Sequence, residues 1–151
     1  MKYAVDTNLL ARLLQANHPL QPEVWQVLQA LLARGGAACV FPQIFYELWV
    51  VATRPVAQNG LGLDVAQMGV EFARLKRFLT FVPDTPQIYP AWEKLVSQHA
   101  VLGRNAHDTR IAAAMLVHGV THLLTYNGGD FKRYPHVTIV TPDDVLNPQT
   151  P

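Results

Sequence analysis

The chain has 151 residues, half of them hydrophobic, with 12 Lys and Arg against 11 Asp and Glu. This length favours one domain, and the composition excludes an intrinsically disordered chain and a strongly basic nucleic-acid coat protein. The longest apolar run, residues 111–117, is shorter than the roughly 20 residues of a membrane span. Because Asp6 interrupts the first apolar residues and Cys39 is the single cysteine, we expect a cytoplasmic protein without disulfides or a membrane anchor.

Apolar residues at strand and helix spacing alternate along the chain. The predicted elements are a strand at 2–5, helices at 9–14 and 24–32, a strand at 39–41, a helix at 43–53, a loop at 56–62, a helix at 63–79, a strand at 81–82, a helix opened by Thr85 and Pro86, a helix at 107–118, and strands at 120–125 and 137–140. Short, nearly all-apolar strands between helices are typical of a parallel sheet that is covered on both faces. We therefore predict an α/β fold, a three-layer α/β/α sandwich with a short, mainly parallel sheet. One domain should span residues 1–146, and residues 147–151 should form a flexible tail.

Four acidic residues occupy positions that such a fold can bring to one edge of the sheet. Asp6 and Asp130 follow predicted strands, Asp108 lies in the first turn of a helix, and Glu47 lies on an otherwise apolar helix that follows a strand. Taken singly, Asp6 fits a helix cap, Asp108 a favourable interaction with the helix dipole, and Asp130 a turn. Together the four indicate a site, because functional groups of parallel sheets gather at the carboxyl ends of the strands.

A cluster of carboxylates repels itself unless a cation neutralises the charge or some members are protonated. Oxygen donors without a Cys or His set favour Mg²⁺ or Mn²⁺ over zinc, and such ions commonly also bind the oxygens of a phosphate substrate. Without these four acids, seven acidic residues remain against 12 basic ones, a balance that lets a polyanion approach. The pattern therefore predicts a metal-dependent site for a phosphodiester.

The segments that carry these residues resemble the PIN-domain nucleases, and within them the bacterial VapC-type toxins of type II toxin–antitoxin pairs. The resemblance rests on residues 5–8, Glu47, residues 107–113 and residues 125–131, in the same order. It implies an α/β/α fold and an endoribonuclease that uses Mg²⁺, or Mn²⁺ as a substitute, to hydrolyse RNA and leave a 5′-phosphate and a 3′-hydroxyl. It also implies that Asp6, Glu47 and Asp108 are catalytic acids, with Asp6 and Asp108 as direct ligands.

The fourth acidic position has two candidates. Many PIN domains carry an acid where this chain has Asn127, and Asp130 follows three residues later. Either Asp130 supplies the charge and binds metal, or Asn127 holds a metal-bound water, so that both one-ion and two-ion catalysis stay open.

Neighbouring polar residues have two interpretations as well. Thr7, Asn8 and Thr125 either orient the carboxylates or make ordinary caps and turns. Arg110 and Arg104 are candidates for contacting the RNA backbone, with pairing to a nearby acid as an equal alternative for Arg110.

The resemblance also implies partners: an RNA substrate, a cognate antitoxin that places Arg or Lys against the carboxylates, and a second copy in a homodimer. Phe45, Trp49 and Trp25 are either dimer contacts or core. The alternative to an enzyme is a catalytically weak PIN-fold module that binds RNA or a protein partner. Phosphoaspartyl chemistry is disfavoured because Asn8 stands where a second Asp is needed, and dinucleotide binding because no glycine-rich turn follows the first strand.

Overall fold

The computed structural model describes residues 1–148 and contains one five-stranded sheet in the order β3-β2-β1-β4-β5. The strands are β1 (Lys2–Val5), β2 (Ala37–Val40), β3 (Thr80–Phe81), β4 (His122–Leu124) and β5 (Thr138–Val140). Every neighbouring pair is parallel. The central strands are short and apolar because both of their faces are covered, and Ala4, Val5, Val40, Leu123 and Leu124 are fully buried. The predicted α/β class is confirmed.

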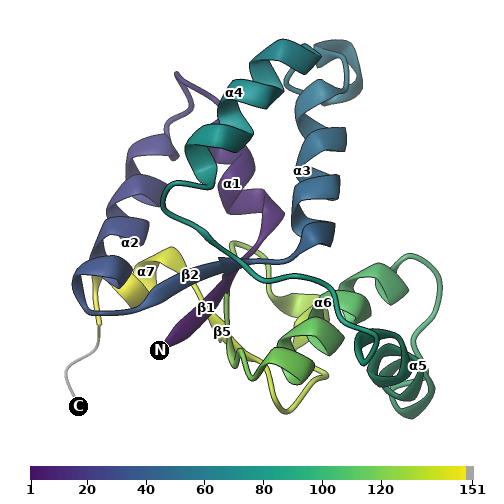
Figure 1. Cartoon of the computed structure of the whole chain (residues 1–151). Coiled ribbons are helices and arrows are strands. Elements are labelled where there is room, and N and C mark those ends of the chain that lie inside the picture. Colours follow the sequence, from purple (N-terminus) through teal and green to yellow (C-terminus); the bar gives the residue numbers. More distant parts are fainter. Residues whose placement is uncertain (149–151) are drawn as a thin grey trace.

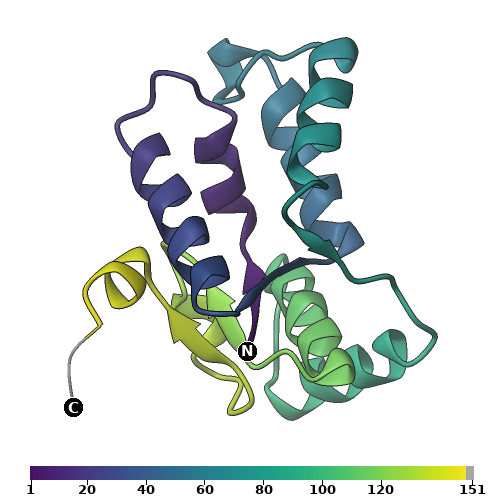
Figure 2. The same cartoon turned by 60° about the vertical axis from the view of Figure 1, so that its left-hand side comes forward.

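Helices cover the two faces of the sheet. They are α1 (Thr7–Leu13), α2 (Gln21–Ala33), α3 (Pro42–Thr53), α4 (Val65–Leu75), α5 (Ile88–Gln98), α6 (Asn105–His118) and α7 (Pro142–Leu146), with short 3₁₀ helices η1 (Val56–Gln58) and η2 (Gly129–Phe131). In both views, α1 to α4 lie on one side of the sheet and α5 and α6 on the other, while α7 lies beside α2 (Figures 1 and 2). Within residues 1–148, no helix is long and apolar enough to span a membrane.

The helix predicted to open at Thr85 and Pro86 begins later, at Ile88. The backbone oxygen of Thr85 accepts a hydrogen bond from Ile88 N at 3.1 Å, which closes a turn ahead of the helix. The buried Thr85 hydroxyl has no hydrogen-bond partner, so it does not cap α5. The prediction of a Thr85 cap was therefore wrong, since the chain uses these residues as a turn.

The helix predicted at 63–79 is shorter than expected at both ends, and a capping box sets its start. The Asp64 side chain accepts from Gln67 N at 2.7 Å, and the Gln67 side chain accepts from Asp64 N at 2.8 Å. The helix then ends at Leu75, and the third strand occupies Thr80 and Phe81, one residue earlier than predicted.

The helix α7 was not predicted. Thr141 and Asp144 form a capping box, with Pro142 in the first turn. Of the tail predicted at 147–151, Asn147 is bonded through its side chain to Asp143 at 2.7 Å, and residues 149–151 lie outside the described residues.

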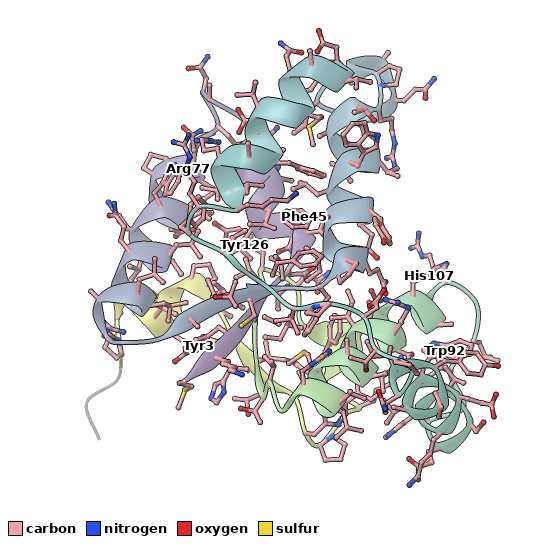
Figure 3. All side chains as sticks on the ribbon, viewed as in Figure 1. Tyr3, Phe45, Arg77, Trp92, His107 and Tyr126 are labelled. Carbon is pink, nitrogen blue, oxygen red and sulfur yellow. The ribbon has the colours of Figure 1, made fainter. Side chains whose placement is uncertain are left out.

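The aromatic residues considered as dimer contacts pack within the chain. The buried Phe45 ring lies 4.8 Å from the Phe72 ring of α4, and the Trp49 ring lies 5.7 Å from the same phenylalanine, measured between centroids. Trp25 packs against Phe78 at 5.1 Å. Figure 3 shows Phe45 reaching from α3 into the region between α3 and α4. These side chains therefore join the helices to one another, as the core interpretation predicts.

Candidate active site

The direction in which strands are added reverses between β1 and β4, and a ligand crevice is expected at the carboxyl ends of these two strands. The chain proceeds from β1 outward to β2 and β3, and then returns to the other side of β1 with β4 and β5. A parallel sheet forms its ligand crevice where the direction of strand addition reverses in this way. Asp6 follows β1 and Thr125 follows β4, and Asp6 N donates to Leu124 O at 3.0 Å, so that the two loops begin side by side.

Hydrogen bonds from both loops orient the carboxylate of Asp6. Its Oδ1 accepts from Thr7 N at 2.7 Å and its Oδ2 accepts from Thr125 Oγ1 at 2.7 Å. Asn8 Nδ2 lies 3.0 Å from Thr125 Oγ1 and 3.4 Å from Asp6 Oδ2. The pKa of Asp6 is raised above its ordinary value, mainly by burial and also by the charge of Glu47. The hydrogen bonds from Thr125 and Thr7 act in the opposite direction and lower the pKa. Asp6 therefore caps α1, as its cap interpretation predicts, and its carboxylate also accepts the hydrogen bond from Thr125 that was predicted as an orienting contact.

Glu47 is joined to Asp6 through Thr7. Glu47 Oε2 accepts from Thr7 Oγ1 at 3.1 Å, and its Oε1 accepts from Gln43 Nε2 at 2.8 Å. Gln43 Nε2 also donates to the backbone oxygen of His107 at 2.8 Å, which ties α3 to the first turn of α6. Gln43 was not among the predicted site residues, although its position four residues before Glu47 puts it on the same helix face.

The charges of the other three acids act on Asp108. Its pKa is raised to about 6, first by burial and then by the negative charges of Asp130, Asp6 and Glu47, while His107 lowers it. Such a shift requires these carboxylates to be near enough to repel one another. The four predicted acids therefore share one electrostatic neighbourhood at the carboxyl edge of the sheet.

Contacts from α5 and from the segment after η2 position the start of α6. Trp92 Nε1 donates to the backbone oxygen of Ala106 at 2.7 Å. The buried hydroxyls of Thr109 and Tyr134 lie 2.6 Å apart, and Thr109 Oγ1 donates to Asn105 O at 2.9 Å. Figure 3 shows His107 at this end of α6, on the side towards α3, with Trp92 on α5 below it. The segment that carries Asp108 is thus held on both sides.

The two candidates for the fourth position have different surroundings. Asp130 is exposed in η2, and its charge makes the largest electrostatic contribution to the raised pKa of Asp108. Asn127 is also exposed, and its backbone N donates to Thr125 Oγ1 at 3.1 Å. Asp130 therefore adds negative charge towards Asp108, whereas Asn127 adds a neutral amide beside the buried Thr125.

The donor set suits a hard divalent cation. The ion pairs among the described residues, Glu71 with Arg74 and Asp84 with Arg110, leave all four crevice acids without a basic partner. The available donors are carboxylate oxygens, which Mg²⁺ and Mn²⁺ prefer. No three acidic, His or Cys side chains of residues 1–148 already stand at the spacing of a metal-ligand group. The acids therefore fit such an ion by their chemistry and their uncompensated charge.

A cavity of about 650 Å³ opens beside these acids, between α3 and the start of α6. Its walls are Thr7, Gln43, Tyr46, Glu47, Val50, Val51, Arg54, His107 and Arg110. Arg110 Nη2 pairs with Asp84 Oδ2 at 2.8 Å, the acid-pairing alternative for this residue, and its Nη1 contacts Gln43 Oε1 at 3.3 Å. Arg104, the other proposed backbone contact, is not among the lining residues. Tyr46, Val50 and Arg54 were missed, although their spacing of four residues puts them along one helix side.

The architecture is similar to solved structures of bacterial toxin–antitoxin complexes. A chain of VapBC2 from Rickettsia felis, solved with a promoter DNA fragment, has a TM-score of 0.69 and 18% identity over 93% of this chain and 98% of that one. DNA-bound VapBC from Salmonella typhimurium has a TM-score of 0.68 and 18% identity over 94% and 98%. Mycobacterium tuberculosis VapC20, described as a Sarcin-Ricin loop cleaving toxin, has a TM-score of 0.59 and 18% identity over 85% and 92%.

No protein-family model and no curated protein matches this sequence. At identities near 18%, the structural likeness establishes a shared fold over nearly the whole chain. It confirms the predicted three-layer fold and the resemblance in fold to VapC-type PIN domains. The chemistry at the crevice has to be argued from this chain's own residues.

Proposed function

We propose that this protein is a divalent-metal-dependent endoribonuclease and the toxin of a toxin–antitoxin pair. The observation that supports the proposal is that Asp6 and Glu47 are both hydrogen-bonded to Thr7, and that, in addition to burial, they and Asp130 raise the pKa of Asp108 by charge repulsion. None of these four acids has a basic partner among the described residues. Such charge is costly to hold together unless a cation is bound or some of the carboxylates are protonated. The likeness in fold to VapC20, which is described as a Sarcin-Ricin loop cleaving toxin, supports the same class of reaction.

The proposed roles follow from the contacts of each side chain. Asp6 and Asp108 bind the ion directly, Glu47 completes the acidic set, and Asp130 or Asn127 occupies the fourth position. A bound Mg²⁺ or Mn²⁺ activates a water and stabilises charge that develops on a phosphodiester. Thr125 and Thr7 hold the carboxylate of Asp6 in one orientation through hydrogen bonds of 2.7 Å each. Asn8 supports this arrangement by donating to Thr125.

The proposed protein partner is a cognate antitoxin. Neighbours in the structural comparison come from VapBC complexes, and one is described as a toxin–antitoxin complex from Klebsiella pneumoniae. An Arg or Lys of the antitoxin would form ion pairs with the carboxylates of the crevice and compete there with metal and RNA. A homodimer stays part of this proposal, with contacts other than the packed aromatic residues of α2 and α3.

The test is cleavage of structured and single-stranded RNA by purified protein with Mg²⁺ or Mn²⁺ and with chelator. Asp6→Asn and Asp108→Asn should each lower the cleavage rate at least about 100-fold, the upper end of what the loss of a supporting residue costs at a metal site. Asp143→Asn, on the exposed side of α7, is the matched control and should cut like the parent. Cleavage that persists in chelator, or in both crevice variants, would contradict the proposal.

The specific alternative is a module that binds RNA or a protein without cutting, and the neutral Asn127 is the feature that favours it. That alternative predicts that the parent binds Mn²⁺ and RNA but leaves single-stranded and structured RNA intact. Measuring binding and cleavage on the same RNA preparation separates the two functions.

A further inference from the structure

We propose that Tyr46 forms the stacking surface for an unpaired RNA base next to the cleaved phosphodiester, and that Arg54 contacts a neighbouring phosphate. The inference rests on the proposed function for its substrate class and adds a binding subsite to it. Both residues line the cavity that begins at Thr7 and Glu47, so the subsite is continuous with the acidic crevice.

The aromatic ring of Tyr46 is exposed and, within the described residues, is not packed against another ring. Its side chain is 66% exposed, whereas Phe45 beside it is buried against α4. Among residues 1–148, the Tyr46 ring stacks on no other aromatic ring, and its hydroxyl makes no side-chain hydrogen bond. Val50, one turn further along α3, is 53% exposed in the same cavity and extends the apolar strip. An exposed aromatic ring and an exposed valine inside a cavity that also has polar walls are groups that a ligand with a flat, partly apolar part can contact.

The charges around the cavity match a strand of nucleic acid. The acidic group is at the Glu47 end, and Arg54 lies two helical turns beyond Tyr46, roughly 12 Å along the axis at 1.5 Å per residue. Arg54 forms no ion pair among the described residues, whereas Arg110 on the opposite wall is paired with Asp84. A metal-bound phosphate at the acids, a base on Tyr46 and a second phosphate at Arg54 would follow the order of these groups along a strand.

This order favours a single-stranded nucleic acid over a duplex or a peptide. In a duplex the base faces are covered by their neighbours, so an exposed ring can stack only on an unpaired base. Proteins that bind single strands combine such rings with basic groups that follow the backbone. A peptide carries no phosphate backbone that could pair with Arg54.

The experiment measures binding of an eight-nucleotide single-stranded RNA in which one base is 2-aminopurine, whose fluorescence falls when it stacks. The protein carries Asp108→Asn throughout, so that the probe is not cut. Tyr46→Ala should raise the Kd about 5- to 150-fold, because stacking on an aromatic side chain contributes about 1–3 kcal/mol per base. It should also abolish the fluorescence decrease. Tyr46→Phe should retain both, because the ring is preserved.

Tyr89→Ala is the matched control, since Tyr89 is 64% exposed but lies on α5 outside this cavity. Its Kd should equal that of the Asp108→Asn parent. Arg54→Ala should weaken binding of every sequence and reduce the slope of log K against log salt by about 1.

A probe with an abasic nucleotide identifies the base that stacks. Where that base is missing, Tyr46→Ala should cause no further loss of affinity, because the two changes remove the same contact. Binding that is equal in the Tyr46→Ala and Tyr46→Phe proteins overturns the stacking subsite, while the proposed nuclease stands or falls on its own cleavage assay. The stacking subsite is also overturned if the parent does not bind RNA but binds an antitoxin peptide, and if Tyr46→Ala removes that peptide binding. Tyr46 and Val50 would then belong to the contact with the protein partner.

Discussion

One buried hydroxyl, that of Thr125, connects both sides of the crevice. Its side chain is fully buried, donates to Asp6 Oδ2 at 2.7 Å, and accepts from Asn8 Nδ2 at 3.0 Å and Asn127 N at 3.1 Å. A hydrogen bond to a charged group contributes about 1.5–3 kcal/mol, and its loss leaves buried groups without a partner. Thr125 is therefore a positioning residue that acts through Asp6.

Thr125→Val keeps the shape of the side chain and removes these hydrogen bonds. We expect the free energy of unfolding to fall by about 2–3 kcal/mol, as measured by urea denaturation. The pKa of Asp6 should rise further, because the Thr125 hydrogen bond lowers it in the parent. The acidic limb of the activity profile should therefore move to higher pH. Thr138→Val, on the exposed side of β5, should change stability by less than about 0.5 kcal/mol and leave the profile unmoved.

Asp108 makes stability depend on pH in the metal-free protein. Its folded-state pKa of about 6 lies above the ordinary value of 3.8, so the folded protein takes up a proton more readily than the unfolded chain. Stability is therefore highest below about pH 4 for this group and falls as pH rises through 6. Asp108→Asn removes this penalty.

In chelator at pH 7.5, Asp108→Asn should be more stable than the parent by about 1 kcal/mol, allowing for solvent screening of a half-buried group. The difference should shrink as the pH is lowered from 6 to 4. Thermal unfolding across this range measures both effects, with Asp143→Asn as the control for the loss of one charge. A variant that is less stable than the parent at pH 7.5 would show that Asp108 is not repelled by its neighbours.

At the scale of elements, helix ends decide where the functional segments begin and stop. The helix α6 ends at Gly119, whose φ of +63° is in the left-handed region that favours glycine. Gly69 lies inside α4 on an exposed face, with no atom within 4 Å of the position that an added β-carbon would occupy. Replacing glycine by alanine should therefore have opposite effects on the free energy of unfolding at Gly119 and at Gly69.

Gly119→Ala should lower the free energy of unfolding by about 1 kcal/mol, because alanine is strained in the left-handed conformation. Gly69→Ala should raise it by about 0.5–1 kcal/mol through higher helix propensity. Chemical denaturation of the two variants gives a paired comparison without loss of a side-chain contact. Equal effects of the same sign would contradict the helix ends described above.

At the scale of the whole molecule, metal binding should stabilise the fold. A ligand that binds only the folded state at 100 times its Kd adds about 2.7 kcal/mol, which corresponds to a rise in Tm of roughly 5–10 °C for a chain of this size. The rise should be smaller at pH 5 than at pH 7.5, because Asp108 must release a proton before it can bind the ion.

The matched comparison is Asp108→Asn. It should start from a higher Tm than the parent in chelator and gain much less from Mg²⁺ or Mn²⁺. Differential scanning fluorimetry with each ion and with Ca²⁺ measures these shifts. A rise of equal size in parent and variant would place the ion outside the crevice.

The sequence alone determined the α/β class, most of the elements, and the local position of each candidate acid. These features follow from short-range rules: apolar periodicity defines helices and strands, and Asp6, Glu47 and Asp108 stand next to strand ends or on helices that can be identified locally. The start of α5 was predicted wrongly because Thr85 and Pro86 fit both a cap and a turn, and the local signal does not distinguish them.

Tertiary structure decided how these local features meet. The strand order, the bond from Gln43 to the backbone of His107, and the cavity that contains Tyr46 all join residues far apart in the chain. The raised pKa of Asp108 has the same origin, because Asp6 and Asp130 approach it only after β1 and β4 pair. Burial and charge repulsion depend on distances between segments, which no local pattern contains, so the sequence determined the residues and the fold determined which of them act on one another.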